Sequence, residues 1–163
     1  MIIADACTVI LLAKASVLET VAATYRLATP KPVYDEVLAG KENLFPDALL
    51  FERLVNEKKI TVVFAPEKVS KKLQRDFNMG AGESSVIAVG ITENKALVAT
   101  DNKQGRMAAH VNDLPLVGSI DIVISLYKKN KITAFKAKAA IKILQEEGWF
   151  HSYLIEKALE DVA

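Results

Sequence analysis

The sequence is poor in the residues that build disulfides and zinc sites. It holds one cysteine, Cys7, and two histidines among 163 residues. A single cysteine excludes an intrachain disulfide and a cysteine-based zinc centre, and it favours a reducing, cytoplasmic setting. The histidines, His110 and His151, do not stand at a metal-ligand spacing. Any metal-dependent or acid–base chemistry must therefore rest on other side chains.

Excess charge and long apolar runs are missing as well. The 21 basic and 20 acidic side chains leave a formal net charge of +1. This balance gives no global electrostatic footprint for nucleic acid, so such binding has to rest on a local patch. No stretch approaches the roughly 18 uninterrupted apolar residues of a membrane span. The apolar start carries Asp5 and has no basic leader or small-residue cleavage site, so we expect neither a signal peptide nor a membrane partner.

Short apolar runs alternate with longer segments of helical periodicity. The predicted strands are residues 1–4, 60–65, 96–100 and 114–118. They are rich in Ile and Val and lack period-2 alternation, as buried strands do. Because helical segments separate them and hairpin signals are absent, the crossovers should be parallel. The sequence predicts a three-layer α/β/α sandwich with a mainly parallel, Rossmann-like sheet.

Helical patterns fill the remainder of the chain. One helix carries Leu11, Leu12, Ala15 and Leu18, and the other central helices are residues 31–40, 46–59, 83–95 and 102–111. Three further helices follow, with Ser119, Thr133 and Ser152 as their predicted N-caps. We expect one domain over residues 1–163, in which residues 119–163 form a helical C-terminal portion. That portion either packs on its own domain or builds a homodimer interface.

Four acidic residues fall where such a sheet would collect a site. Ligands bind outside the carboxyl ends of parallel strands. Asp5 follows the first predicted strand and Asp101 follows the strand at 96–100, so both face the same edge. Glu36 lies in a short helix opened by a proline, and Glu83 begins a helix after a glycine loop. Taken singly, each acid is explained as a helix cap, a first-turn residue or a solvated helix residue.

Taken together, the acids point to a cation. Two carboxylates about 5 Å apart repel by about 3 kcal/mol at an effective dielectric near 20. A cluster of three or four therefore needs a cation or raises its pKa values. Oxygen-only ligation suits Mg²⁺ or Mn²⁺. Such a site hydrolyses phosphodiesters by activating a water and stabilising the leaving oxygen, without a histidine.

Four segments in a particular order carry a family resemblance. The succession "IADACTVILLAKASVLETV", "PKPVYDEVLAG", "GAGESSVIAVG" and "LVATDNKQGRMAA" resembles the PIN-domain family, ribonucleases that include VapC-type toxins. The later "LPLVGSIDIVISLYKKNKI" resembles the family's strand, Gly-Ser/Thr turn and helix. Each motif is degenerate alone, but their order over the first ~130 residues is fairly specific.

The resemblance implies an acidic pocket that depends on Mg²⁺ or Mn²⁺. Asp5, Glu36, Glu83 and Asp101 match the family's four acids in order. We expect Asp5, Glu83 and Asp101 to hold an ion directly, and Glu36 to help bind a second ion or to orient the water. The resemblance also implies a single-stranded RNA substrate, a homodimer and a cognate antitoxin.

The chain departs from the family pattern at two positions. Cys7 stands where a small polar residue is usual, so Thr8 is the candidate for supplying the hydroxyl. Asn102 replaces a second Asp that many members carry after the fourth acid.

Two further residues are candidate supporting side chains. Arg106 matches a recurring basic residue and is expected to pair with a neighbouring acid or to contact RNA phosphate. Asp121 is an extra acid that is either a first-turn helix residue or a pocket residue.

Two other functions remain open from the sequence. A PIN-like fold can serve as a catalytically weak or inactive nucleic-acid-binding or assembly module, although such a scaffold would be free to lose an acid. The segment "DACTV" also resembles the nucleophile motif of haloacid-dehalogenase phosphatases. In that interpretation Cys7 takes the place of the second Asp, and a convincing downstream Asp pair is missing.

Overall fold

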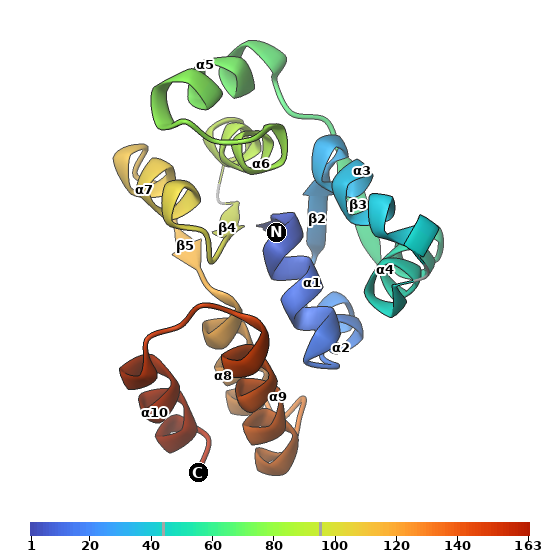
Figure 1. Ribbon diagram of the computed structural model, residues 1–163, viewed down its shortest axis with the longest axis vertical. Coiled ribbons are helices and arrows are strands. Elements are labelled where there is room, and N and C mark those ends of the chain that lie inside the picture. Colours follow the sequence, from blue (N-terminus) through green and yellow to red (C-terminus); the bar gives the residue numbers. More distant parts are fainter. Residues whose placement is uncertain (44, 95) are drawn as a thin grey trace.

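A five-stranded parallel sheet in the order β3-β2-β1-β4-β5 forms the centre of the protein. The computed structural model (Figure 1) describes residues 1–43, 45–94 and 96–163. The strands are β1 Ile2–Ala4, β2 Leu27–Pro30, β3 Ile60–Val63, β4 Leu97–Ala99 and β5 Leu116–Val117. The helices are α1 Ala6–Lys14, α2 Leu18–Thr24, α3 Lys31–Ala39, α4 Pro46–Asn56, α5 Glu67–Phe77, α6 Ala81–Thr92, α7 Lys103–Val111, α8 Ser119–Lys128, α9 Ala134–Glu147 and α10 Ser152–Asp161, with a short 3-10 helix at Gly40–Asn43.

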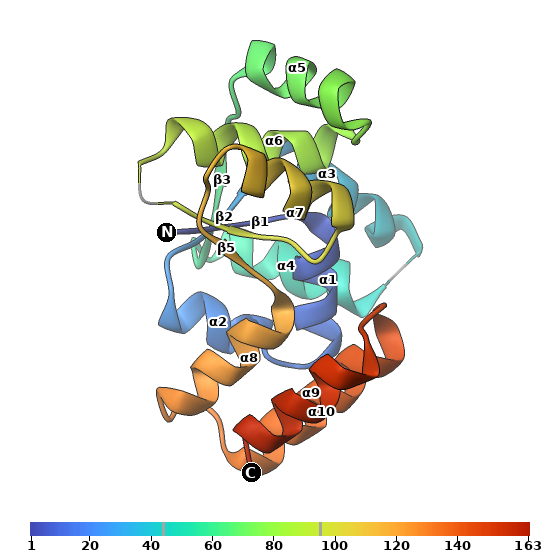
Figure 2. The ribbon, with the colours of Figure 1, turned by 90° about the vertical axis from the view of Figure 1, so that its left-hand side faces the viewer.

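The helices cover both faces of the sheet. Figure 2 shows α6 and α7 on one side of the strands, and α1 and α2 on the other. Helices α8 and α9 pack against α1, and α10 packs against both of them, so the C-terminal helices lie outside the first helical layer. The central strand β1 is buried along its whole length because helices cover it from both sides. The predicted α/β/α architecture with a parallel sheet and a helical C-terminal region is confirmed.

Helix α6, which follows the glycine loop, is apolar on nearly all sides because other elements cover it on nearly all sides. It is buried from Ser84 to Gly90, since α5 packs on it from outside and the sheet lies beneath it. A helix that is apolar all round needs cover on all sides. Helix α5 provides it with a narrow buried stripe at Ser70 and Leu73 and leaves its charged face to solvent.

Several sequence predictions need correction. The predicted strands omit β2, and the predicted helices omit α5. The single helix predicted through Leu18 is two helices, because Ser16 adopts a left-handed backbone (φ 59°) and the chain turns by 113° there. The helix predicted at 83–95 is α6, and its expected last residue, Lys95, lies outside the described residues.

One of the three predicted N-caps is confirmed, and the other two are wrong. Thr133 caps α9, with its hydroxyl accepting from the Lys136 amide at 3.1 Å. Ser119 and Ser152 are instead the first helical residues of α8 and α10. The cap positions before them belong to Gly118 and to His151, whose side chain makes no capping hydrogen bond.

Within the described ranges, no single helix has the length and apolar character needed to cross a membrane. Helices α1 and α2 reach that length and composition only when the bent pair is taken together.

Candidate active site

Asp5 lies at the carboxyl end of the central strand and caps α1. Its Oδ1 accepts a hydrogen bond from the Thr8 amide at 2.8 Å, which fixes the carboxylate at the start of the helix. The residue is only 3% exposed, and its Oδ2 has no hydrogen-bond partner in the described part of the chain. The Asp5 amide donates to the Ala99 carbonyl at 3.2 Å, so β1 and β4 end side by side. One oxygen of Asp5 is therefore held by an amide, and the other is buried, with the Thr100 side chain near enough to lower the pKa of Asp5.

Asp101 follows β4 and reaches the first turn of α8. Its Oδ1 and Oδ2 accept from the Ser119 amide at 3.0 and 3.3 Å. A carboxylate at a helix N-terminus is stabilised by unpaired amides and by the helix dipole. A Cβ at position 118 would stand 2.8 Å from Asp101 Oδ1, so Gly118 permits this approach. The turn between β5 and α8 thus positions an acid that lies 18 residues earlier in the chain.

Glu36 and Glu83 enter the site from α3 and α6. Glu83 lies in the first turn of α6, and Glu36 lies on the exposed side of α3. A Cβ at position 82 would stand 2.5 Å from Glu36 Oε2, so the Glu36 carboxylate rests against Gly82 at the beginning of α6. The glycine loop that precedes Glu83 therefore makes room for a second carboxylate.

The four acids influence one another electrostatically. Burial raises the pKa of Asp5, and the charge of Glu83 adds to the rise. Burial also raises the pKa of Glu36, and Asp5 and Glu83 add to it. The pKa of Asp101 is raised by burial and by Asp5, against the hydrogen bonds from Ser119 that lower it. The pKa values of Asp5, Glu36 and Asp101 are therefore raised by burial first and by neighbouring acidic charge second.

Cys7 lies among these acids. Desolvation raises the pKa of its thiol to about 12, and Asp5, Asp101, Glu83 and Glu36 all add to the rise. The thiol is therefore protonated at neutral pH and adds no charge to the cluster. The sequence treats Cys7 only as a departure from a family pattern, and no local signal places it beside all four acids.

Two of the predicted supporting residues, Thr8 and Asn102, hydrogen-bond to the backbone. The Thr8 hydroxyl is buried and donates to the Ala99 carbonyl at 3.4 Å. Asn102 caps α7, accepting from the amides of Gln104 and Gly105. This capping role accounts for Asn102 without a ligand.

Two further candidates flank Asp101. Asp121 Oδ2 accepts from the Gly118 amide at 2.9 Å, so Asp121 caps the start of α8. Arg106 Nη1 donates to the Thr100 carbonyl at 3.1 Å. No acidic oxygen of the described residues lies within 4.0 Å of Arg106, but its positive charge lowers the pKa of the neighbouring Asp101.

The oxygen atoms of the four acids are of the kind that bind a hard divalent cation. The side chains are not arranged as a complete set of metal ligands. All four acids offer oxygen atoms, and Asp5 Oδ2 is buried without a partner. In residues 1–43, 45–94 and 96–163, however, no three His, Cys, Asp or Glu side chains stand in a metal-ligating arrangement. Asp5 and Asp101 are each held by a backbone amide, from Thr8 and from Ser119.

A hollow of about 660 Å³ opens beside Asp101. Its walls come from the start of α7, from α8, and from α10 with the segment before it. The lining includes Asp101, Lys103, Arg106, Trp149, His151 and Lys157. Of the four candidate acids, Asp101 lines this hollow.

Comparison with known proteins gives one family. A family model described as a PIN domain, DUF3368, matches residues 1–163. Comparisons with curated proteins and with solved structures give no significant match. PIN domains are generally nucleases that use divalent metal ions, and the parallel sheet with acids at its carboxyl edge agrees with that assignment. The chain belongs to the PIN-domain family.

Proposed function

We propose that the chain is a Mg²⁺- or Mn²⁺-dependent endoribonuclease that hydrolyses phosphodiester bonds of single-stranded RNA. The observation that supports the proposal is the position of Asp5 and Asp101 at the carboxyl ends of the paired strands β1 and β4, with Asp5 Oδ2 buried and without a hydrogen-bond partner in the described part of the chain. Like charges that raise one another's pKa are a cost to the folded protein unless a cation neutralises them.

The chain's own residues would hold and orient the reacting groups. Asp5, Glu83 and Asp101 provide the oxygens for one ion, and Glu36 provides an oxygen for a second ion or for the attacking water. When bound, a divalent ion there lowers the pKa of a water and stabilises the leaving oxygen. The Thr8 and Ser119 amides fix Asp5 and Asp101 before substrate arrives, which reduces the reorganisation needed in the reaction.

Substitution of the two fixed acids tests this proposal. Asp5→Asn and Asp101→Asn should each abolish cleavage of a single-stranded RNA and weaken Mn²⁺ binding measured by calorimetry, while circular dichroism shows an unchanged fold. Asp35→Asn is the matched control, because Asp35 lies on α3 beside Glu36 but pairs with Lys31 at the surface. Cleavage at the parent rate by both site variants would overturn the mechanism.

The second candidate function is a catalytically weak or inactive PIN-like binding or assembly module. It is favoured by the absence of a closed metal-ligating arrangement in the described ranges. A crystal structure with Mn²⁺ soaked in separates the two functions. Manganese held by Asp5 and Asp101 supports the nuclease, whereas carboxylates pointing apart without an ion support the module.

We extend the nuclease proposal to a homodimeric, VapC-like toxin that a cognate antitoxin holds inactive. The support is the resemblance of the four acid motifs to that branch, with Asp5 and Asp101 fixed in the fold. Expression of the chain should arrest growth, and co-expression of a short neighbouring reading frame should restore it. Growth arrest by Asp101→Asn as strong as by the parent would contradict a toxin that acts through cleavage.

A further inference from the structure

The hollow beside Asp101 shares that residue with the candidate active site and is larger than an ion needs. Its volume of about 660 Å³ falls within the roughly 300–1,000 Å³ of ligand sites. Asp101 and Gly118 line one end, and α10 lines the other with Leu154 and Ala158. Figure 1 shows α7 and α10 on the same side of the molecule, with the β5–α8 connection between them. A ligand held in this hollow would therefore lie beside Asp101.

Trp149 stands at the edge of the hollow with its ring in solvent. It has a relative exposure of 103%, and it also borders a second hollow of about 680 Å³ lined by residues 145–151. Phe150 and His151 border both hollows as well. An aromatic ring without packing contacts adds nothing to the core, but its open face can stack on a nucleobase of any sequence.

Three cations line the same hollow. Lys103, Arg106 and Lys157 come from α7 and α10, and none has a carboxylate of the described residues within 4.0 Å. Three acids line the hollow as well. Asp101 and Asp121 each accept from an amide at the start of α8, and Asp161 lies at the end of α10. Lys103 and Lys157 are therefore available to an anionic ligand, while Arg106 also donates to the Thr100 carbonyl.

We propose that this hollow binds the nucleotides of a single-stranded RNA that flank the scissile bond. Trp149 stacks on a base, while Lys103, Arg106 and Lys157 contact phosphates. The assignment rests on the proposed nuclease function and adds the path of the substrate. Aromatic rings interspersed with cations fit single-stranded nucleic acid. A second protein copy or a peptide would have to bring carboxylates to the three cations.

Trp149 is the only tryptophan in the chain, so its fluorescence reports on the surroundings of this one ring, which borders both hollows. A single-stranded oligouridylate or oligoadenylate, titrated in EDTA so that metal-dependent cleavage is blocked, should quench the emission. A duplex of the same length should quench it much less, because its bases are already stacked. Absence of quenching by both single strands would overturn the proposal.

Variants then separate stacking from charge. With a labelled oligouridylate and anisotropy as the readout, Trp149→Ala should weaken binding roughly 5- to 150-fold, and Trp149→Phe should restore much of the loss. Phe135→Ala is the matched control, because Phe135 is 84% exposed on α9 and does not line the hollow. Equal effects of the two alanine variants would contradict a stacking site at Trp149.

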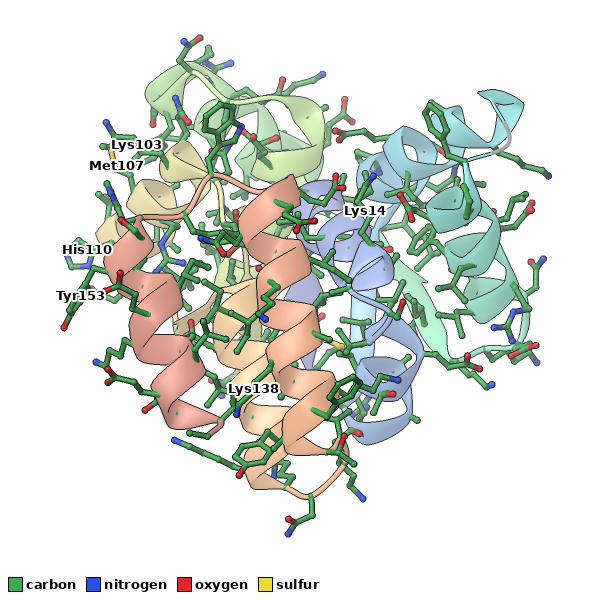
Figure 3. The ribbon with its side chains drawn as sticks, turned by 60° about the horizontal axis from the view of Figure 1, so that its bottom comes forward. Lys14, Lys103, Met107, His110, Lys138 and Tyr153 are labelled. Atoms are coloured by element: carbon green, nitrogen blue, oxygen red, sulfur yellow. The ribbon has the colours of Figure 1, made fainter. Side chains whose placement is uncertain are left out.

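The phosphate contacts have their own signature in the salt dependence of binding. Lys103→Gln and Lys157→Gln should each reduce the slope of log K against log salt by about 0.7. Lys138→Gln should leave the slope unchanged, since Lys138 lies on α9, well apart from Lys103 in Figure 3. In the same figure Lys103 on α7 and Tyr153 on α10 project from one side of the molecule. Unchanged slopes in both hollow variants would overturn the assignment of phosphate contacts.

The experiments distinguish a failure of the nuclease proposal from a failure of the proposal that the hollow binds RNA. Fluorescence quenching without metal-dependent cleavage would leave the RNA subsite standing and overturn the nuclease. Cleavage without quenching, and with Trp149→Ala as active as the parent, would leave the nuclease standing and overturn the subsite. A concentration-dependent dimer that Trp149→Ala dissociates, without any effect on RNA binding, would assign the hollow to a second copy instead.

Discussion

Replacing Gly82 with alanine should slow RNA cleavage without lowering the stability of the protein. The added Cβ would stand 2.5 Å from Glu36 Oε2 and 3.7 Å from Val33 Cγ2. The contact with Val33 is ordinary, so the backbone need not move. The contact with Glu36 is too short, and the flexible end of that side chain has to retreat.

The size of the displacement follows from the distances. Moving the Glu36 carboxylate from 2.5 Å to an ordinary 3.4 Å requires a shift of about 0.9 Å. Misplacement of a reacting group by about 1 Å can lower a rate by about 100-fold. Stability should change in the opposite sense, because alanine in place of glycine in a helix stabilises by up to about 1 kcal/mol. We expect Gly82→Ala to cleave RNA about 10- to 100-fold more slowly at unchanged or slightly raised stability.

Cleavage rates with Mn²⁺ and urea unfolding in EDTA give the two readouts. Gly80→Ala is the matched control, since a Cβ there meets no atom within 4 Å. The control should keep its rate and lose less than about 1 kcal/mol. A Gly82→Ala variant with the parent's rate would show that the position of Glu36 is unimportant. A loss of stability above about 2 kcal/mol would show that Gly82 is packed against a rigid group.

Three further substitutions test the electrostatics, the helix cap and the core. Burial raises the pKa of Asp5, so the folded state holds this proton more tightly than the unfolded state, and stability in EDTA should fall as pH rises above the ordinary value of 3.8. Asp5→Asn should remove that fall and be the more stable protein at neutral pH; parallel urea-stability profiles of parent and variant across pH would refute this. Asp121→Ala removes the acceptor for the Gly118 amide and should cost about 1 kcal/mol in urea unfolding while cleavage continues, whereas lost cleavage would move Asp121 into the metal site. Phe51→Ala should cost about 3–5 kcal/mol in urea unfolding, because Phe51 is fully buried and its ring centroid lies 5.9 Å from that of Tyr34; a loss below about 1 kcal/mol would contradict its place in the core.

Much of the fold could be predicted from local patterns. Apolar runs such as those of β1 and β4 are buried on both faces, and strands of this kind show no alternation in sequence. Strand β2 gave too weak a signal, because it has four residues and ends in Pro30, a residue that usually ends strands. Helix α5 has few apolar residues, and its role as a cover for α6 is a property of the packed fold.

Less of the candidate site could be predicted. The sequence placed Asp5 and Asp101 at one edge, because parallel neighbouring strands end together. It did not predict that the Ser119 amide would donate to Asp101, or that Asn102 and not Asp101 would be the N-cap of α7. Such contacts join residues from separate elements, so no local spacing encodes them.

By itself the sequence determined the class of fold, and it placed Asp5 and Asp101 at the ends of neighbouring parallel strands. These depend on hydrophobic runs, helix signals and strand direction, which are local properties of the chain. Only the tertiary structure decided that Glu36 rests against Gly82, that Cys7 lies among all four acids, and that Trp149 borders a hollow beside Asp101. The physical reason is that these juxtapositions arise where α3 packs on α6 and where α10 packs on α8, which is set by how the layers fit together.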